Sequence, residues 1–203
     1  MTEDRPTAPF RDSGRGGVAL LIIDMMNDFS FSEGDSLRAK AALIAAPILK
    51  LRSQVEALDG SIIYVNDHFG EWHSEQRKIV DRALQSDSAA VRQLVPRASD
   101  YFIIKPQFSG FYATNLPVLL PKLGVSRLIL CGVAADICVL FTAADAHMRD
   151  YALWVPEDVV ASTSDARHRA ALEIMRESMG AKVASTDQLS AADWVRGLDQ
   201  CEG

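Results

Sequence analysis

One cysteine lies where the chain could activate a nucleophile. Cys138 follows an apolar run, Leu128 to Cys131, and a turn at Gly132, and it precedes apolar residues at helical spacing. This pattern predicts a strand, a turn and a helix, with Cys138 in the first helical turn. Free N–H groups and the helix dipole favour a thiolate there. The same pattern fits a buried structural cysteine, and this stretch alone does not decide between the two interpretations.

Polar side chains follow three other apolar runs that read as strands. They are Asp24 after residues 18–23, Asp67 and His68 after residues 61–65, and Lys105 after residues 101–104. In a doubly wound sheet the carboxyl ends of the strands meet at one edge, and ligands bind there near the point where the strand order reverses. We therefore expect an acid, a base and a thiol to converge at this edge, which favours a catalytic role for Cys138.

Asp24, Lys105 and Cys138 can form a catalytic triad. Asp24 can take the thiol proton as a general base and return it to a leaving amine. Lys105 can hold the thiolate and the carboxylate in their charged forms. Backbone N–H groups of Ala134 and Cys138 can stabilise a tetrahedral oxyanion. Taken singly, Asp24 is as easily a turn cap and Lys105 a solvated loop residue, but together they favour the triad.

The elements that must position these residues alternate between strand and helix. Helices are predicted at residues 37–58, 75–84, 114–123, 137–148 and 165–179, and further strands at 152–155 and 181–184. Such alternation indicates a three-layer α/β/α fold with a doubly wound, Rossmann-like sheet. Residues 1–17 are expected to be a flexible tail, and residues 18–203 a single domain.

Composition limits the class of protein. The chain has 203 residues, of which 48% are hydrophobic and 24% charged, as in an ordinary globular protein with one sizeable core. The net charge of −6 argues against nucleic acid or an acidic membrane surface as a partner. Three cysteines suit a reducing compartment, and no apolar run is long enough to span a membrane. We expect a cytoplasmic enzyme that acts on a small molecule.

Three blocks of sequence resemble the isochorismatase-like cysteine hydrolases, the family of nicotinamidases, N-carbamoylsarcosine amidases and isochorismatases. The blocks are Leu20–Asp24 with Asn27–Phe29, Ile104–Tyr112, and Cys131–Val139 with Thr142–Ala146, and the likeness runs from about Val18 to Val183.

The resemblance implies a six-stranded parallel sheet with helices on both faces, and a homo-oligomer. It also implies that Asp24, Lys105 and Cys138 are the triad. A non-proline cis peptide bond between Val133 and Ala134 is implied as well, and it would aim the Ala134 N–H into the oxyanion hole.

Two features set this chain apart from subfamilies that it resembles. Nicotinamidases carry an Asp-x-His pair after the second strand and a further histidine, which hold a metal. Here His68 directly follows Asp67, Phe69 comes next, and His73 alone does not complete a ligand set. We therefore expect no metal and no other cofactor. Some isochorismatases cleave a vinyl ether and lack this cysteine, so Cys138 favours thiol chemistry on an amide or carbamoyl C–N bond.

Several other residues are weaker candidates. Aromatic residues that could wall a small pocket beside Asp67, or equally be core or interface residues, are Phe29, Trp72, Phe108, Phe111 and Tyr112. Residues expected to have structural or surface roles are Cys131, Asp145, His147, Asp158, His168 and Cys201.

Three alternatives to amide hydrolysis stay open. They are vinyl ether hydrolysis of the isochorismatase type, a non-catalytic binding protein on the same fold, and a thiol redox protein. The last is disfavoured because the chain has no Cys-x-x-Cys pair. Iodoacetamide separates the others, since an active triad predicts fast labelling of Cys138 at neutral pH and an idle one predicts labelling of Cys201 only.

Overall fold

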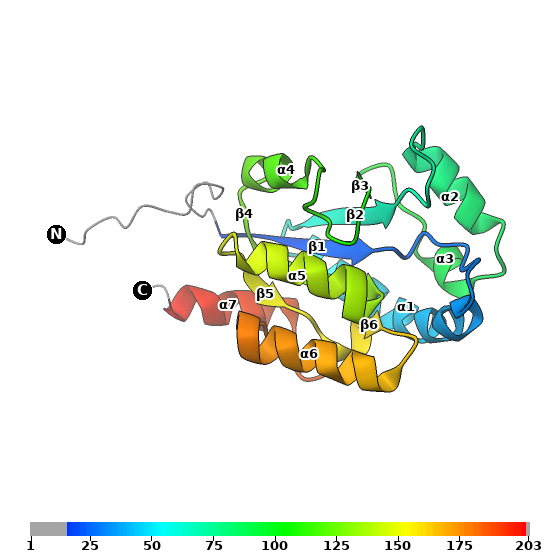
Figure 1. Ribbon diagram of the computed structural model, residues 1–203. Helices are drawn as coiled ribbons and strands as arrows, with labels where there is room; N and C mark the ends of the chain where they lie inside the picture. The colour runs from blue at the N-terminus through cyan, green and yellow to red at the C-terminus, as the bar shows by residue number, and fades with distance from the viewer. Residues whose placement is uncertain (1–15, 202–203) are drawn as a thin grey trace.

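The computed structural model describes residues 16–201, and these form a three-layer α/β/α arrangement around one parallel sheet (Figure 1). The strands are β1 (Gly17–Ile23), β2 (Ser61–Asp67), β3 (Tyr101–Lys105), β4 (Val125–Val133), β5 (Ala152–Trp154) and β6 (Val160–Ala161). Their order is β3-β2-β1-β4-β5, and β6 pairs with the end of β4. The predicted doubly wound sheet of six parallel strands is therefore confirmed.

Helices cover both faces of the sheet. They are α1 (Gly34–Glu56), α2 (Gln76–Leu84), α3 (Ala89–Gln93), α4 (Leu116–Lys122), α5 (Leu140–His147), α6 (Asp165–Met179) and α7 (Ala191–Cys201), with a π-helix η1 (Ala135–Val139) and a 3-10 turn η2 (Glu157–Val159). No helix within residues 16–201 is long and apolar enough to cross a membrane. Residues 1–15 of the expected tail lie outside the described residues, and Gly17 is the first residue of β1.

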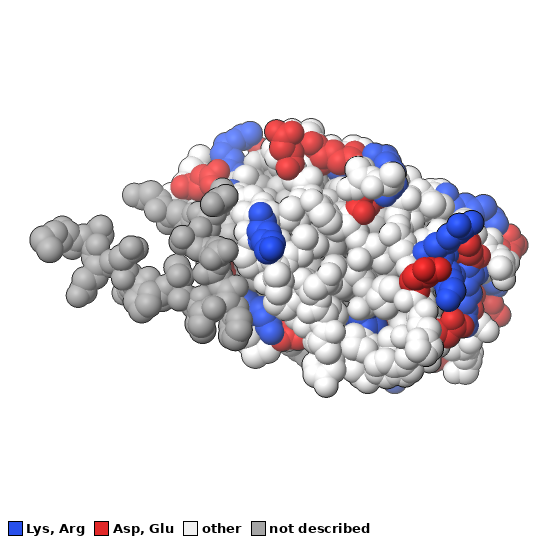
Figure 2. All heavy atoms as spheres, turned by 90° about the horizontal axis from the view of Figure 1, so that it is seen from above, with Lys and Arg blue, Asp and Glu red and all other residues white. Residues whose placement is uncertain are grey.

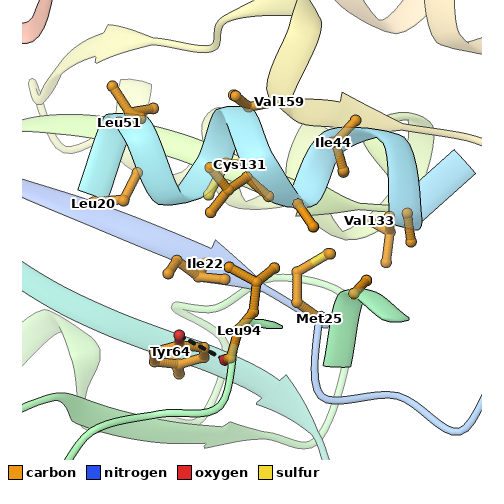
Figure 3. Packing of buried hydrophobic residues seen from close by; sticks show 14 of the residues in the cluster. Leu20, Ile22, Met25, Ile44, Leu51, Tyr64, Leu94, Cys131, Val133 and Val159 are labelled. Atoms are coloured by element: carbon orange, nitrogen blue, oxygen red, sulfur yellow. Dashed lines mark hydrogen bonds between the residues drawn. The ribbon is translucent and has the colours of Figure 1, made fainter. Parts of the chain in front are cut away.

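The central strands are apolar because both of their faces are buried. Leu20 and Ile22 of β1 face one core, which α1, α2, α3 and α7 complete. Leu21 and Ile23 face the opposite core, which α4, α5 and α6 complete. Figure 3 shows the first of these cores, with α1 packed over side chains of β1 and β4. Burial on both faces explains the continuous apolar run of residues 18–23 and places Asp24 at its end.

The prediction of a strand at residues 181–184 is wrong, because the structure has no strand of the sheet there. Only Lys182 bridges to Trp154 there, and the carbonyl of Ala184 instead accepts a hydrogen bond from the Trp154 indole at 2.8 Å. The sixth strand is β6, whose two residues are too short to give a periodic signal. The five-residue helix α3 escaped prediction for the same reason.

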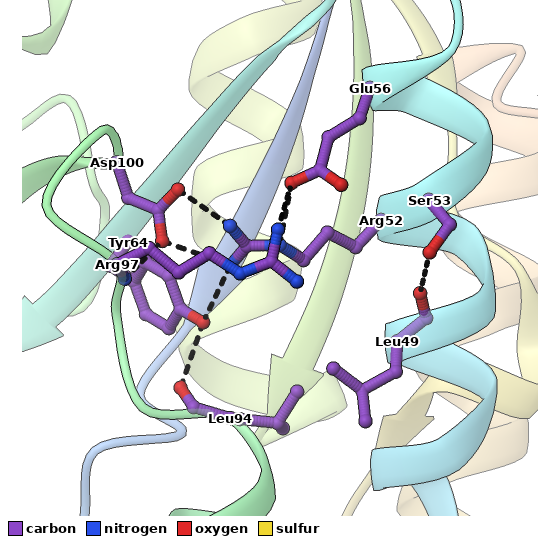
Figure 4. A network of polar contacts seen from close by, with 8 residues as sticks. All are labelled: Leu49, Arg52, Ser53, Glu56, Tyr64, Leu94, Arg97 and Asp100. Carbon is purple, nitrogen blue, oxygen red and sulfur yellow. Dashed lines mark hydrogen bonds and ion pairs between the residues drawn. The ribbon is translucent and has the colours of Figure 1, made fainter.

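A buried ion pair fixes the start of β3 (Figure 4). The Arg52 guanidinium of α1 lies 2.7 Å from the Asp100 carboxylate, and both side chains are almost fully buried. Arg52 also reaches Tyr64, whose hydroxyl donates to the Leu94 carbonyl at 2.8 Å. Such a pair adds little net stability, yet losing one partner costs about 3–5 kcal/mol. The network therefore holds α1, β2 and the residue before β3 in one geometry.

Charged side chains are mixed in sign on the face that Figure 2 shows. Lys and Arg lie beside Asp and Glu towards the ends of that face, and most of its middle carries no charge.

Candidate active site

The structure brings the three predicted triad residues together at the carboxyl edge of the sheet. The Lys105 ammonium lies 2.9 Å from an oxygen of Asp24 and 3.4 Å from the sulfur of Cys138. Asp24 follows β1, Lys105 ends β3, and Cys138 lies in η1 after β4. The strand order reverses between β1 and β4, so these residues meet at the switch point where doubly wound sheets bind ligands.

The Asp24 carboxylate is held on both of its oxygens. One oxygen accepts a hydrogen bond from the Asp67 backbone N–H at 2.7 Å, and the other faces Lys105. The backbone N–H of Asp24 donates to the Val65 carbonyl, which keeps the end of β1 beside β2. The carboxylate therefore has a fixed direction, as a general base needs.

A tight turn at Gly132 delivers Cys138 to the same edge. The φ angle of Gly132 is +113°, and an added Cβ would lie 2.0 Å from the Ile23 carbonyl oxygen, so only glycine fits. The peptide bond between Val133 and Ala134 is cis, the arrangement that the resemblance implied. Cys138 lies in the π-helix η1 rather than in the first turn of α5, and π turns are frequent at functional sites.

Burial sets the charge states of the triad at rest. Burial and the neighbouring Asp24 raise the pKa of Cys138, although Lys105 lowers it, so the thiol form predominates at neutral pH. This direction is opposite to the expectation drawn from a helix N-terminus. Burial also raises the pKa of Asp24. Burial alone would lower the pKa of Lys105, but Asp24 and Cys138 outweigh it and raise that pKa, so Lys105 stays charged.

A cavity of about 440 Å³ lies over Asp24 and Cys138. Val133, Ala134, Asp67 and Phe108 also line it, whereas Lys105 is fully buried behind the wall. A small substrate in this cavity can contact the sulfur and the carboxylate, while the lysine acts on both charges from within the protein.

Four predicted pocket residues do not line this cavity, and these predictions are corrected. Phe29 has a φ of +56° and packs into the core beneath α1. Trp72 is 77% exposed and lies against His68, with ring centroids 4.7 Å apart. Tyr112 is 60% exposed and lines a separate groove together with Phe108 and Phe141. Phe111 packs in the core against Tyr151. Only Asp67 and Phe108 of the predicted set reach the cavity.

Other lining residues were not predicted. They are Asn27, Phe31, Glu33, Leu37, Phe69, Asp136, Ile137, Thr163 and Arg167. Asn27 and Asp136 lie inside the sequence blocks that carry the resemblance, so their place in those blocks was a usable signal. Thr163 and Arg167 follow the two-residue strand β6. Because that strand was not predicted, the residues after it could not be placed at the carboxyl edge of the sheet.

The residues after β2 do not fit a metal ion. One oxygen of Asp67 accepts a hydrogen bond from the Phe69 N–H at 2.6 Å, and the other lies 3.5 Å from Lys105. The Nδ1 atom of His68 accepts from the Gly70 N–H at 2.9 Å, so its buried Nε2 carries the proton and offers no lone pair. Within residues 16–201, no group of three or more His, Cys, Asp or Glu side chains is placed to hold a metal.

Most residues that were expected to have structural or surface roles are buried, hydrogen-bonded within the protein or exposed at its surface. Cys131 is fully buried in β4, and burial raises the pKa of its thiol. Asp145 bonds Ser109 and Arg149, and Asp158 bonds Thr186. His147 is exposed and His168 is half-buried on α6, while the Cys201 side chain lies outside the described part of the chain.

The family model described as Isochorismatase domain matches residues 18–188. The isochorismatase family protein YaaI of Bacillus subtilis (strain 168) is 40% identical over 84% of this chain and 95% of its own length. The phenazine biosynthesis protein PhzD1 of Pseudomonas aeruginosa is 32% identical over 85% of this chain and 84% of its own.

Solved structures of related hydrolases are also similar to this chain. N-carbamoylsarcosine amidase from Thermoplasma acidophilum is similar with a TM-score of 0.65 and 29% identity, over 85% of this chain and 98% of that one. A nicotinamidase from Staphylococcus aureus is similar with a TM-score of 0.64 and 25% identity, over 83% of this chain and 97% of that one.

Proposed function

Because this chain belongs to the isochorismatase family and is a hydrolase, we propose that it cleaves an amide or carbamoyl C–N bond of a small molecule through a thioester at Cys138. The observation that carries the proposal is the position of the Lys105 ammonium, 2.9 Å from Asp24 and 3.4 Å from the Cys138 sulfur. One buried cation between an acid and a thiol at a cavity wall stabilises the negative charge on either group as a proton passes from the thiol to the acid.

Acylation begins with the thiol, which is the resting form. As the sulfur attacks the carbonyl carbon, Asp24 takes the thiol proton, and the raised pKa of its carboxyl makes it a stronger base than an exposed aspartate. The carbonyl oxygen becomes an oxyanion, for which we assign the N–H groups of Ala134 and Cys138 as donors. The C–N bond then breaks, and Asp24 returns the proton to the leaving nitrogen.

Hydrolysis of the thioester uses the same groups. Asp24 removes a proton from water as its oxygen attacks the acyl carbon. The C–S bond breaks, the sulfur regains a proton, and the carboxylic or carbamic acid leaves. Lys105 remains an ammonium throughout, because Asp24 and Cys138 raise its pKa.

A further lining residue supports an N–H-bearing substrate. Asp136 lines the cavity, and its Oδ1 atom is buried with no hydrogen-bond partner among the described residues. An unpaired buried acceptor is costly, and an amide or carbamoyl N–H would satisfy it. An ether oxygen has no hydrogen to donate.

The test is mass spectrometry of enzyme quenched during turnover of a panel of small amides and carbamoyl compounds, with ammonia release measured in parallel. The expected result is ammonia from at least one compound and an acyl adduct on the peptide that contains Cys138. Isochorismatase-type cleavage of a vinyl ether is the second candidate, favoured by relatives such as the probable isochorismatase of Pseudomonas chlororaphis. Vinyl ether turnover that persists in Cys138→Ala, with no adduct from any amide, would overturn the thioester assignment.

Chelation is expected to leave amide hydrolysis unchanged. The reason is that Asp67 and His68 form hydrogen bonds within the protein, and among residues 16–201 no further His, Cys, Asp or Glu joins them in a group of three that could hold a metal. The measurement is kcat/KM before and after dialysis against EDTA. Loss of activity that zinc, iron or manganese restores would show that other residues bind a required metal.

A further inference from the structure

We propose that Thr142 and Asp145 are positioning residues that hold Lys105 against Cys138 by bracing the loop after β3 to α5. The proposal rests on the proposed function, since it concerns how the same triad is kept in register. Thr142 and Asp145 follow Cys138 at steps of four and then three residues. Thr142 and Asp145 lie three residues apart in α5 and share one face of that helix, while Cys138 lies in η1 directly before it.

Thr142 and Asp145 both accept hydrogen bonds from the loop that begins directly after Lys105. The Gly110 N–H donates to the Thr142 hydroxyl at 2.9 Å, and the Ser109 hydroxyl donates to the Asp145 carboxylate at 2.5 Å. The Ser109 hydroxyl oxygen in turn accepts from the Phe111 N–H at 3.1 Å. We call these three hydrogen bonds the loop brace.

The loop brace is rigid at both ends. On the helix, Thr142 is fully buried, and Arg149 holds Asp145 at 2.6 Å. The Arg149 guanidinium also lies over the Phe111 ring, 4.9 Å from its centroid. On the loop, an added Cβ at Gly110 would lie 2.8 Å from a methyl carbon of Val65, so the loop is pressed between β2 and α5.

The loop brace controls one triad distance more than the other. Pairing of Lys105 with Asp67 in the sheet already fixes Lys105 next to the strand ends that carry Asp24. The sulfur of Cys138 lies in η1, directly before α5, and the loop brace joins α5 to the loop after Lys105, together with the ring contact between Phe108 and Phe141 and the contact of Arg149 with Phe111. Loosening the loop brace should lengthen the 3.4 Å contact between Lys105 and Cys138 and leave the 2.9 Å contact with Asp24 in place.

A change in the contact between Lys105 and Cys138 can be measured through the pKa of Cys138 and through kcat. Lys105 lowers the pKa of Cys138, so a longer contact raises that pKa and slows alkylation at a given pH. A misplacement of about 1 Å costs catalysis about a hundredfold without a matching loss of binding. A residue that only supports the fold changes neither quantity once folded protein is counted.

The test compares Thr142→Val, which keeps the shape and loses the acceptor, with Thr142→Ser, which keeps the hydroxyl. Iodoacetamide labelling of Cys138 is followed from pH 6 to 10 by peptide mass spectrometry, and kcat and KM are measured on the amide found above. We expect Thr142→Val to move the labelling profile up by about one pH unit, a tenfold slower rate on its rising limb. Its kcat should fall about 10- to 100-fold with KM within about threefold. Thr142→Ser should stay within about threefold of the original protein in all three quantities.

Two more variants provide a second test of the loop brace and a matched control. Ser109→Ala removes the loop side of the brace without altering the buried helix face, and it should shift the profile in the same direction if Thr142→Val does not fold. Thr186→Val is the matched control, because it breaks a comparable buried hydrogen bond to Asp158, outside the cavity. It should lower the melting temperature and leave the labelling profile unchanged.

The proposal is overturned if folded Thr142→Val labels with the original pH profile, or if Thr186→Val shifts it equally. Labelling requires no substrate, so the loop brace is tested even if no amide is hydrolysed. Failure of the amide panel with an intact difference between Thr142→Val and Thr142→Ser would reject the proposed reaction alone. A Cys138 that resists labelling at every pH would reject both.

Discussion

Cys138→Ala is expected to abolish amide hydrolysis and to leave the protein folded. A methyl group cannot form a thioester, so turnover should fall about 10⁴-fold or more. The side chain lies at the margin of the core rather than inside it, and the loss of one sulfur there should cost only about 1 kcal/mol. The measurements are kcat on the amide substrate and the free energy of unfolding from a denaturant titration.

Cys131→Ala provides the matched control. It removes the same atom from a fully buried position in β4, away from the cavity. We expect the opposite pattern, with a larger loss of stability and kcat close to the original. Turnover by Cys138→Ala above a trace would contradict covalent catalysis, and equal losses of activity in both variants would mean that the sulfur matters only for packing.

Lys105→Met is expected to damage both activity and stability. Methionine fills similar space without charge, so the Asp24 carboxylate stays buried without its cation. Removing one partner of a buried pair costs about 3–5 kcal/mol. Turnover should fall at least about a thousandfold, while KM changes little, because Lys105 does not line the cavity.

The stability loss should depend on pH with a definite sign. Burial already raises the pKa of Asp24 above its ordinary value, and the loss of Lys105 removes an influence that lowers it. Between the ordinary pKa and the raised one, the native state binds more protons than the unfolded state, so stability falls as pH rises through that window. The deficit of Lys105→Met should therefore be larger at pH 8 than at pH 5.

Denaturant titrations at these two pH values measure this difference. Lys50→Met is the control, because Lys50 is exposed and pairs with Asp187 at the surface, where such pairs contribute about 1 kcal/mol or less. A deficit for Lys105→Met that is the same at both pH values would mean that Asp24 is not the group left uncompensated.

Much of the fold could be predicted from the sequence because each central strand carries its own signal. The run Val18–Ile23 is apolar on both faces and is followed by the carboxylate of Asp24. Both the strand and the position of Asp24 at its end could therefore be predicted. The two residues of β6 carry no such signal, because they become a strand only by pairing with Gly132 and Val133. Their place in the sheet is a tertiary effect.

The cavity wall could be predicted only where residues lie at the end of a strand or within a few residues after it. Asp67 and Phe108 met this condition, but the orientation of Trp72 and Phe29 depends on the loop backbone. Phe29 enters the core because its φ angle is positive, and no neighbouring residue in the sequence indicates that conformation. The raised pKa of Cys138 could not be predicted from its place at the start of a helix, because burial and the charge of Asp24 are tertiary effects.

The pairing of β1 with β4 also bears on how the chain folds. It joins Gly17 to Val125, more than a hundred residues apart, and closing so long a loop costs conformational entropy and slows folding. In an unfolded chain the thiol of Cys138 is solvated, with an ordinary pKa of about 8.5, and it is open to oxidation and disulfide exchange. In the native protein, burial raises the pKa of Cys138, and Lys105 lies beside its sulfur. We therefore expect Cys138 to be oxidised more readily in the unfolded chain than in the native protein.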